Sequence, residues 1–210
     1  MSVWFPKNRG KVRGWRRRAR HVDEWRRRHL APDDTLLDAD GRDWAKLYLA
    51  PWYRLARREP PAWLRRRIVA ALVDVHAAWH QHLDEREPAE PFDCMLWLLA
   101  PFVIESQVVA ASGDMRAFYR DTFPPASDDV PPTPPEAVYG SAVRGLRWSP
   151  VLVPGYTTQE DLDEDAEWAR VFERRHCANV LSETEAHGTT QITFRVGHGW
   201  IGRLPGSSPA

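Results

Sequence analysis

Cysteine and lysine are both scarce in this sequence. Only two of its 210 residues are cysteines, Cys94 and Cys177. Two cysteines are too few for a disulfide framework, and both can remain free thiols in a reducing compartment. Only three of the 29 basic residues are lysines, and the others are arginines. An arginine excess also arises in GC-rich genomes, so by itself it does not indicate a binding function.

Two further absences concern targeting. No apolar segment follows the basic N-terminus, so the arginines at 16–18 are not a twin-arginine export signal and no signal peptide is predicted. The most apolar run, residues 92–112, is bracketed by Asp93 and Glu105 and interrupted by Pro101. A membrane span needs about 20 predominantly apolar residues without such breaks. We therefore expect a cytoplasmic protein without a membrane partner.

Catalytic motifs are also missing. The chain has neither a G-x-S-x-G nucleophile elbow nor a phosphate loop with its lysine. Residues Gly197 to Gly202 match the G-x-G-x-x-G pattern of dinucleotide sites, but only eight residues follow, and three of them are proline or glycine. The helix that must hold the pyrophosphate therefore cannot follow. We interpret these glycines as a hairpin turn, and we expect no nicotinamide, flavin or other cofactor and a non-enzymatic protein.

No metal-binding pattern is complete, so we expect no metal site. Asp161, Asp163 and Asp165 have the spacing that begins a calcium loop. Ala166 and Phe172, however, occupy the places of the required glycine and glutamate. An acidic first turn of a helix explains the three aspartates better, because carboxylates are favourable at a helix N-terminus.

Three histidines and one glutamate are weaker candidates. His76 and His80 are four residues apart on a predicted helix, with His82 nearby. This spacing can hold a metal, but the glutamate of the metalloprotease motif is missing, so a structural role at the border of the apolar face is favoured. Glu105 lies beside a predicted strand, where burial would raise its pKa. The sequence leaves the roles of these four residues open.

The net formal charge of zero hides a division along the chain. Residues 1–68 hold 19 Lys+Arg and 8 Asp+Glu, a formal charge of +11, and residues 69–210 carry the opposite charge of −11. Two explanations are open. The halves neutralise each other within the fold, or each half faces a different partner.

The strongest basic surface belongs to an amphipathic helix predicted from Gly14 to Leu30. At about 100° per residue, Trp15, Ala19, Val22 and, more peripherally, Trp25 and Leu30 fall on one side of this helix. The opposite side is a candidate partner-binding surface, because guanidinium groups bind carboxylates and phosphates. No aromatic residue interleaves with these arginines, so the face lacks a platform for stacking bases. A merely solvated face is the alternative. The arginines of this face are Arg16, Arg17, Arg20, Arg27 and Arg28.

Periodicity and turn residues predict the other elements. A proline-started helix from residue 60 to about 85 is the strongest, and its apolar face should lie on a sheet. Two buried strands should flank Pro101 and form the middle of that sheet. The remaining predictions are a short strand within 44–52, helical turns within 114–122, a loop at 124–135, an edge strand at 147–153, a helix from a Thr157–Glu160 capping box to Cys177, and a meander of strands at 180–183, 190–196 and 200–204 with turns at Gly188 and 197–199.

Together these elements predict an α+β fold, with helices packed on one face of a mainly antiparallel sheet. We expect Trp79 of the long helix and Trp97 of the central strand to be buried and to face each other. The length favours a single domain, residues 1–210. The proline-rich loop at 124–135 separates a basic N-terminal part with the central strands from a C-terminal part with a helix and the β-meander.

Five segments, in this order, carry a family resemblance. They are the arginine-rich start of a helix in Arg13-Gly14-Trp15 to Trp25, the aromatic segment Trp44 to Pro51, the proline-started helix Pro61 to Leu83, Ser106-Gln107-Val108-Val109, and Trp200-Ile201-Gly202. The order resembles that of an uncharacterised bacterial family, a domain of unknown function. The likeness covers about half of the chain, and the proline-rich loop and the helix near Trp168 depart from it. The resemblance implies no catalytic residue.

Three functions fit the sequence. The first is a cytoplasmic, non-enzymatic protein-binding module, such as an immunity or antitoxin protein of a bacterial toxin system; the polarised charge favours it, since complementary fields select partners. The second is a nucleic-acid-binding protein that uses the arginine-rich helix. The third is an enzyme whose site only the fold assembles. A protein partner is favoured over nucleic acid, because the acidic half would repel an extended polyanion.

Overall fold

The computed structural model describes residues 14–37, 44–48, 60–85, 92–100, 106–112, 133–186 and 188–205. These stretches form helices and a six-stranded sheet, which confirms the predicted α+β class. The predictions for Glu105, for helical turns within 114–122 and for most of the loop at 124–135 fall outside the described residues.

Every strand pair in the described sheet is antiparallel. The strands follow the order β1-β3-β2-β6-β4, and β5 pairs with one end of β6. The two central strands predicted from the apolar run are β2 and β3. The strands are β1 (Trp44–Tyr48), β2 (Asp93–Ala100), β3 (Gln107–Ala111), β4 (Arg147–Thr158), β5 (Val180–Ala186) and β6 (Thr189–Arg203).

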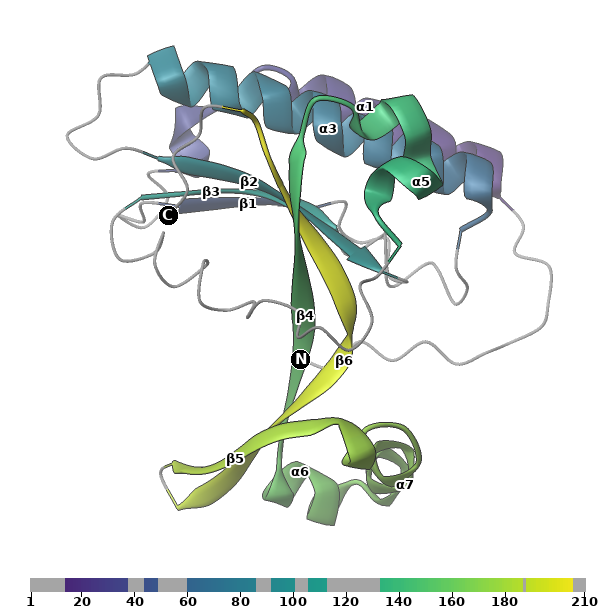
Figure 1. Cartoon of the computed structure of the whole chain (residues 1–210), viewed down its shortest axis with the longest axis vertical. Coiled ribbons are helices and arrows are strands. Elements are labelled where there is room, and N and C mark those ends of the chain that lie inside the picture. Colours follow the sequence, from purple (N-terminus) through teal and green to yellow (C-terminus); the bar gives the residue numbers. More distant parts are fainter. Residues whose placement is uncertain are drawn as a thin grey trace.

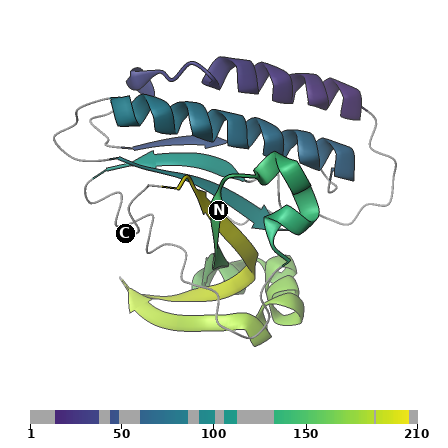
Figure 2. The same ribbon diagram turned by 45° about the horizontal axis from the view of Figure 1, so that its top comes forward.

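Two long helices, α1 (Trp15–His29) and α3 (Ala62–Glu85), lie side by side over one face of the sheet (Figures 1 and 2). They run parallel, because Asp23 contacts Arg67, and Arg26, further along α1, contacts Asp74, further along α3. Both predicted helices are confirmed. A short 3-10 helix, η1 at 34–36, follows α1.

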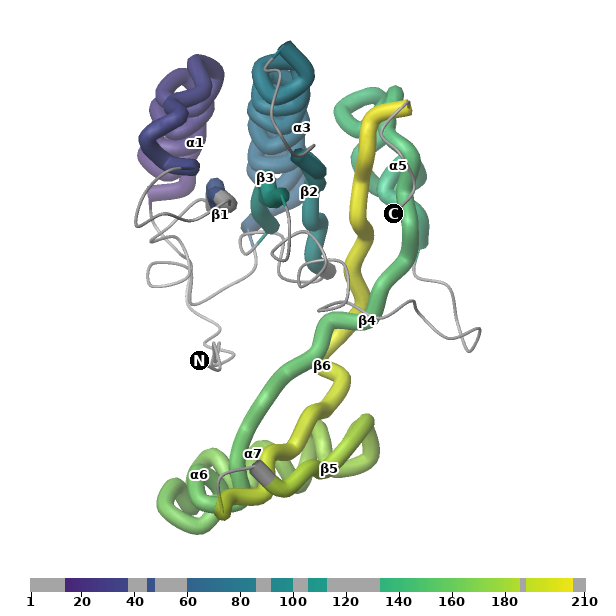
Figure 3. Tube along the Cα trace, turned by 90° about the vertical axis from the view of Figure 1, so that its left-hand side faces the viewer, coloured from purple at the N-terminus to yellow at the C-terminus, as the bar shows by residue number. Residues whose placement is uncertain are grey.

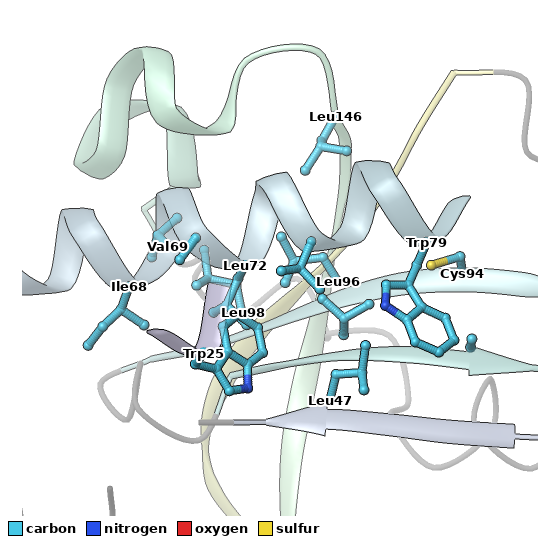
Figure 4. Close-up of a cluster of buried hydrophobic side chains, with 14 of the residues drawn as sticks. Trp25, Leu47, Ile68, Val69, Leu72, Trp79, Cys94, Leu96, Leu98 and Leu146 are labelled. Carbon is cyan, nitrogen blue, oxygen red and sulfur yellow. The ribbon is translucent and has the colours of Figure 1, made fainter. Parts of the chain in front are cut away.

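The apolar face of α3 joins the helix layer to the sheet. Leu64, Ile68 and Leu72 have no exposed surface and belong to the largest hydrophobic cluster (Figure 4). Trp79 belongs to the same cluster, and its indole Nε1 donates a hydrogen bond to the carbonyl oxygen of His29 at 3.2 Å. The indole therefore satisfies a carbonyl group at the C-terminal end of α1, where intrahelical partners run out.

Trp97 is buried, as predicted, but it lies on the opposite face of the sheet from Trp79. Successive side chains of a strand point to opposite faces. In β2, Leu96 and Leu98 join Trp79 in the cluster beneath the helices, whereas Met95 and Trp97 belong to a separate cluster. The prediction that the two tryptophans face each other is therefore wrong.

β4 and β6 extend beyond the main body and carry a distal lobe, which we define as residues 155–196 (Figure 3). In this lobe β5 completes a three-stranded sheet, and two short helices, α6 (Gln159–Glu164) and α7 (Ala166–Arg175), adjoin it. The lobe has a hydrophobic cluster of its own, in which the rings of Phe172 and Phe194 are 5.1 Å apart.

The helix predicted between Thr157 and Cys177 is in fact these two helices, α6 and α7. Asp165 separates them, because its backbone has the extended values φ −111° and ψ 91°. Its carboxylate accepts hydrogen bonds from the backbone N–H groups of Glu167 and Trp168, at 3.0 and 2.9 Å, and so caps the second helix.

The predicted capping box is shifted by one residue. The hydroxyl of Thr158 accepts a hydrogen bond from the backbone of Asp161, and the Asp161 carboxylate accepts one from the backbone of Thr158, both at 3.0 Å. Thr157, predicted to pair with Glu160, is buried instead and accepts a hydrogen bond from the indole of Trp168 at 2.9 Å. Either of the two adjacent threonines could have been the N-cap residue of this helix. Thr158 takes that position, whereas Thr157 is buried.

The glycines at 197–199 do not form a turn, because β6 runs without interruption through them. The predicted meander is therefore one hairpin, with its turn at Gly188 as predicted. Within β6, Gly199 and Gly202 leave space that side chains of the neighbouring strands occupy. A Cβ atom on Gly199 would lie 3.2 Å from the side chains of Leu99 and Val153, and one on Gly202 would lie 2.7 Å from the ring of Trp148.

One proline of the predicted loop at 124–135 is part of a helix. Pro135 begins the short helix α5 (Pro135–Tyr139), and η4 at 140–143 follows directly. Proline suits this first helical position, because its missing N–H would have no partner there. The segment contacts α3, and Val143 is buried in the main cluster.

In the described sheet β4 is an edge strand, as predicted, but it continues beyond residues 147–153 into the distal lobe. Pro150 and Pro154 interrupt its backbone donors, and the pairing with β6 shifts register between Val153 and Pro154. Prolines and irregularities of this kind protect an exposed edge from pairing with other chains.

We predict that Gly202→Ala lowers the free energy of unfolding by about 1–3 kcal/mol, since the new methyl group would overlap the indole of Trp148. Chemical denaturation measures this change. In a Trp148→Leu background the same glycine substitution should cost clearly less. An equal cost in both backgrounds would contradict the close approach of strand and ring.

Candidate functional site

Helix α1 divides into a buried side and a basic side. Ala19, Val22 and Trp25 are buried against the main body, as the periodicity predicted, whereas Leu30 is exposed. The side chains on the opposite side all face solvent, and we call this set the arginine face. It consists of Arg16, Arg17, Arg20, Arg27 and Arg28.

Other arginines join α1 to α3. Arg26 Nε donates to Asp74 Oδ2 at 2.6 Å, and Arg67 donates two hydrogen bonds to the carboxylate of Asp23, at 2.8 and 2.6 Å. The hydrogen bonds from Arg67 hold the pKa of Asp23 below its usual value. Exposed ion pairs contribute only about 0–1 kcal/mol each, so these pairs mainly fix the register of the two helices.

The arginine face itself has no acidic partner among the described residues. Arg27 Nε donates only to the backbone oxygen of Asp23, at 3.4 Å. Glu24 is the carboxylate that lies among these arginines, and it is 3.3 Å from Nδ1 of His21. Five guanidinium groups with one carboxylate among them leave the face with a net positive charge, and none of the five is ion-paired within the described part of the chain.

The helix dipole does not favour arginines in the first turn of α1. Arg16 and Arg17 lie at the start of α1, where free backbone N–H groups make the helix end positive. Neither α1 nor α3 has an acidic residue in its first turn. Because the two helices are parallel, both positive ends lie at the same end of the helix layer (Figure 2). Several guanidinium groups at this end raise the positive potential further.

A cluster of acidic residues lies at the other end of the molecule. Residues 159–167 hold six carboxylates and no basic residue, and all six are exposed. They belong to α6 and the start of α7 in the distal lobe, far from α1 (Figure 1). The described structure thus has a basic pole and an acidic pole, without an ion pair between the arginine face and the acidic segment.

The three aspartates with calcium-loop spacing form hydrogen bonds within and at the ends of α6 and α7. Asp161 and Asp165 are the capping residues described above. Asp163 Oδ1 accepts a hydrogen bond from the side-chain amide of Gln159 at 2.8 Å. Their carboxylates therefore have local helix partners, as expected for acidic residues in first turns and caps.

The three histidines of α3 have separate partners. His76 Nε2 lies 3.0 Å from the carbonyl oxygen of Cys94, whereas His80 and His82 each contact an aspartate carboxylate, at 2.9 and 2.7 Å. The described residues contain no group of three or more metal-ligating side chains. The sequence spacing thus does not bring these histidines to one site in that part of the chain.

His76 and Cys94 are buried inside the main cluster. The Cys94 carbonyl can only accept, so His76 Nε2 carries the proton, and Nδ1 is left without a hydrogen-bond partner. Burial lowers the pKa of His76 to about 4 and raises the pKa of the Cys94 thiol well above its usual value. Both groups are therefore neutral at pH 7, which suits a structural role.

Trp63 is a surface residue that the sequence reasoning missed. It lies in the first turn of α3 and is 49% exposed, the highest exposed fraction, with Tyr156, among the large apolar side chains of the described residues. The helical periodicity already predicts that Trp63 is exposed. The apolar face of α3 begins at Leu64, and Trp63 lies about 100° away from that face.

Comparisons with known proteins found no match to this chain among protein-family models, curated proteins or solved structures. The resemblance to a bacterial family of unknown function therefore stays a prediction. None of the helices in the described stretches is long and apolar enough to cross a membrane.

We predict that His76 makes the protein less stable as the pH falls from about 6.5 to 4. Over this range the unfolded chain protonates the imidazole, whereas the folded chain keeps it neutral. The stability contributed by the neutral side chain is complete above pH 6.5, and about 3 kcal/mol is lost once the pH has fallen through 4. Denaturation curves at a series of pH values measure the loss.

The matched variant is His76→Gln, which removes the titrating group but can still donate to the Cys94 carbonyl. Its stability should depend less on pH over the same range. His21→Gln, at an exposed position of α1, is the control. Equal pH dependence in wild type and His76→Gln would contradict this prediction.

Proposed function

We propose that this protein is a non-enzymatic binding module whose arginine face docks on an acidic surface of a partner protein. The observation that carries the proposal is the exposure of five arginines on one side of α1, none of which forms an ion pair with a carboxylate of the described residues. Guanidinium groups suit this role, because they form forked hydrogen bonds with carboxylates. An immunity protein that neutralises a bacterial toxin is a protein of this kind.

The separation of charge supports the same proposal. An acidic partner is attracted by the basic pole at α1 and repelled by the acidic pole at 159–167. Such a field orients the partner before contact and raises the association rate. The neutral total charge then does not weaken the interaction, because the two poles lie at opposite ends.

The position of Arg16 and Arg17 also supports a role in binding. The first turn of a helix favours acidic residues, so two arginines there oppose local stability. Departures from a local rule without a structural partner are typical of functional surfaces. An arginine excess from base composition alone would not require the side chains to gather on one face.

Nucleic acid is the second candidate, and the exposed indole of Trp63 favours it, because a base could stack there. Two observations favour protein. Glu24 lies within the arginine face, so a phosphate backbone that followed α1 would meet a carboxylate. Trp15 offers no second platform, because it is only partly exposed and the guanidinium of Arg18 lies 4.7 Å from its ring centre.

We predict that charge reversal of the face weakens partner binding without unfolding the protein. The wild-type protein, immobilised and exposed to a lysate of its host with and without nuclease, should retain one protein partner under both conditions. In the variant, the affinity for that partner, once purified, should fall about 100-fold, as expected for four surface ion pairs. The thermal midpoint should change little, because glutamates at 16 and 17 suit the first turn of α1, whereas a glutamate at 27 opposes the helix dipole in the last turn. The variant combines Arg16→Glu, Arg17→Glu, Arg20→Glu and Arg27→Glu.

A matched control reverses the same number of charges on exposed arginines outside α1. It should bind like the wild type. If the wild type retains only nuclease-sensitive nucleic acid, the second candidate replaces the first. If the α1 variant is merely less stable and the wild type retains nothing, the arginine face has a structural role. The control combines Arg144→Glu, Arg147→Glu, Arg170→Glu and Arg174→Glu.

A further inference from the structure

We infer that Trp63 extends the arginine face onto α3, and that the composite surface binds a protein segment with an apolar side chain among carboxylates. This inference rests on the proposed function and names the chemistry of the partner. In contrast to a purely electrostatic contact, such a surface would have an indole ring as its main source of binding energy.

Trp63 does not belong to the buried core of the described residues. Leu64, the next residue, is fully buried and begins the apolar face of the helix, whereas half of the Trp63 surface is exposed. Burial of apolar surface is favourable by roughly 25 cal/mol for each Å² removed from water, and the exposed part of the ring does not gain this free energy in the free protein. A partner that covers this ring recovers that free energy.

The register of the helices places Trp63 beside the arginine face. Arg67 of α3 contacts Asp23 of α1, so these two residues mark one side of the helix pair. Trp63 lies one turn before Arg67 on the same side of α3. Arg20 and Arg16 lie about one and two turns before Asp23 on α1. Because the helices are parallel, Trp63 and these two arginines lie near the N-terminal end of the helix pair, on the side of the Asp23–Arg67 contact.

The surroundings of the indole are basic on both helices. Arg66, three residues after Trp63, is exposed and has no acidic partner in the described part of the chain. On α1, Asp23 is occupied by the bidentate contact from Arg67. A partner must therefore bring an apolar group to the ring and carboxylates to the surrounding guanidinium groups.

Tryptophan and arginine are the residue types that most often dominate the energy of protein interfaces. An apolar side chain on the indole would also exclude water from the neighbouring arginine–carboxylate pairs, which strengthens them. A nucleic acid would use the ring differently, by stacking a base on it, and would gain from several such rings in succession. Trp63 is the exposed aromatic residue that the described structure shows on this side of the helix pair.

The test uses two short fluorescent peptides of equal length and charge, both rich in glutamate. One carries leucine at its centre, and the other carries serine there. The wild-type protein should bind the leucine peptide about fivefold to tenfold more tightly, as expected for a partly buried leucine. A uridine oligonucleotide of the same length is the third probe, and all affinities are measured at two salt concentrations.

The variant Trp63→Ala should bind both peptides with the affinity and salt dependence that the serine peptide shows for the wild type. Trp63→Phe keeps an aromatic ring and should keep most of the leucine preference. Trp63→Gln is a second replacement in case the alanine variant melts early. The charge-reversed α1 variant should lose both peptides.

The outcomes separate the two claims. If the wild type binds neither peptide, the proposed function and this inference both fail. If it binds both equally, or if Trp63→Ala keeps the leucine preference, the inference fails and the proposed function stands. If the oligonucleotide binds more tightly than both peptides and weakens with Trp63→Ala, the composite surface is a nucleic-acid site and the inference is overturned.

Discussion

The burial of α3 on the sheet is the contact on which the rest of the structure depends. Its apolar side chains fill the space between the helix layer and β2, and Trp79 also binds the last turn of α1. The ion pairs of Asp23 and Asp74 then fix α1 against α3. The direction in which the arginine face points is therefore set by α3, although none of its arginines belongs to that helix.

The continuous strand β6 provides the second constraint. It pairs with β2 in the main body and with β5 in the distal lobe, so one strand holds the basic and acidic poles apart. Gly199 and Gly202 permit this path, because side chains of β2 and β4 approach the strand at these positions. The charge separation that supports partner orientation is thus a consequence of sheet topology.

The sequence predicted the helices better than the strands, for physical reasons. An amphipathic helix records its buried side in the 3.6-residue period, which located α1, α3 and the arginine face. A strand buried on both faces has no alternation, so the direction of Trp97 could not be predicted. The glycines of β6 look like turn residues, and only distant partners such as Trp148 show why they lie in a strand. That no carboxylate of the described residues forms an ion pair with the arginine face, and that Trp63 lies beside this face, depends on the helix register, which no local pattern contains.

The measurement that tests the central claim most directly is hydrogen exchange of the protein, free and bound to the partner that it retains. The account predicts new protection of backbone amides in α1 and the first turns of α3, with the acidic segment 159–167 unchanged. Protection confined to the distal lobe, with α1 exchanging as in the free protein, would contradict it.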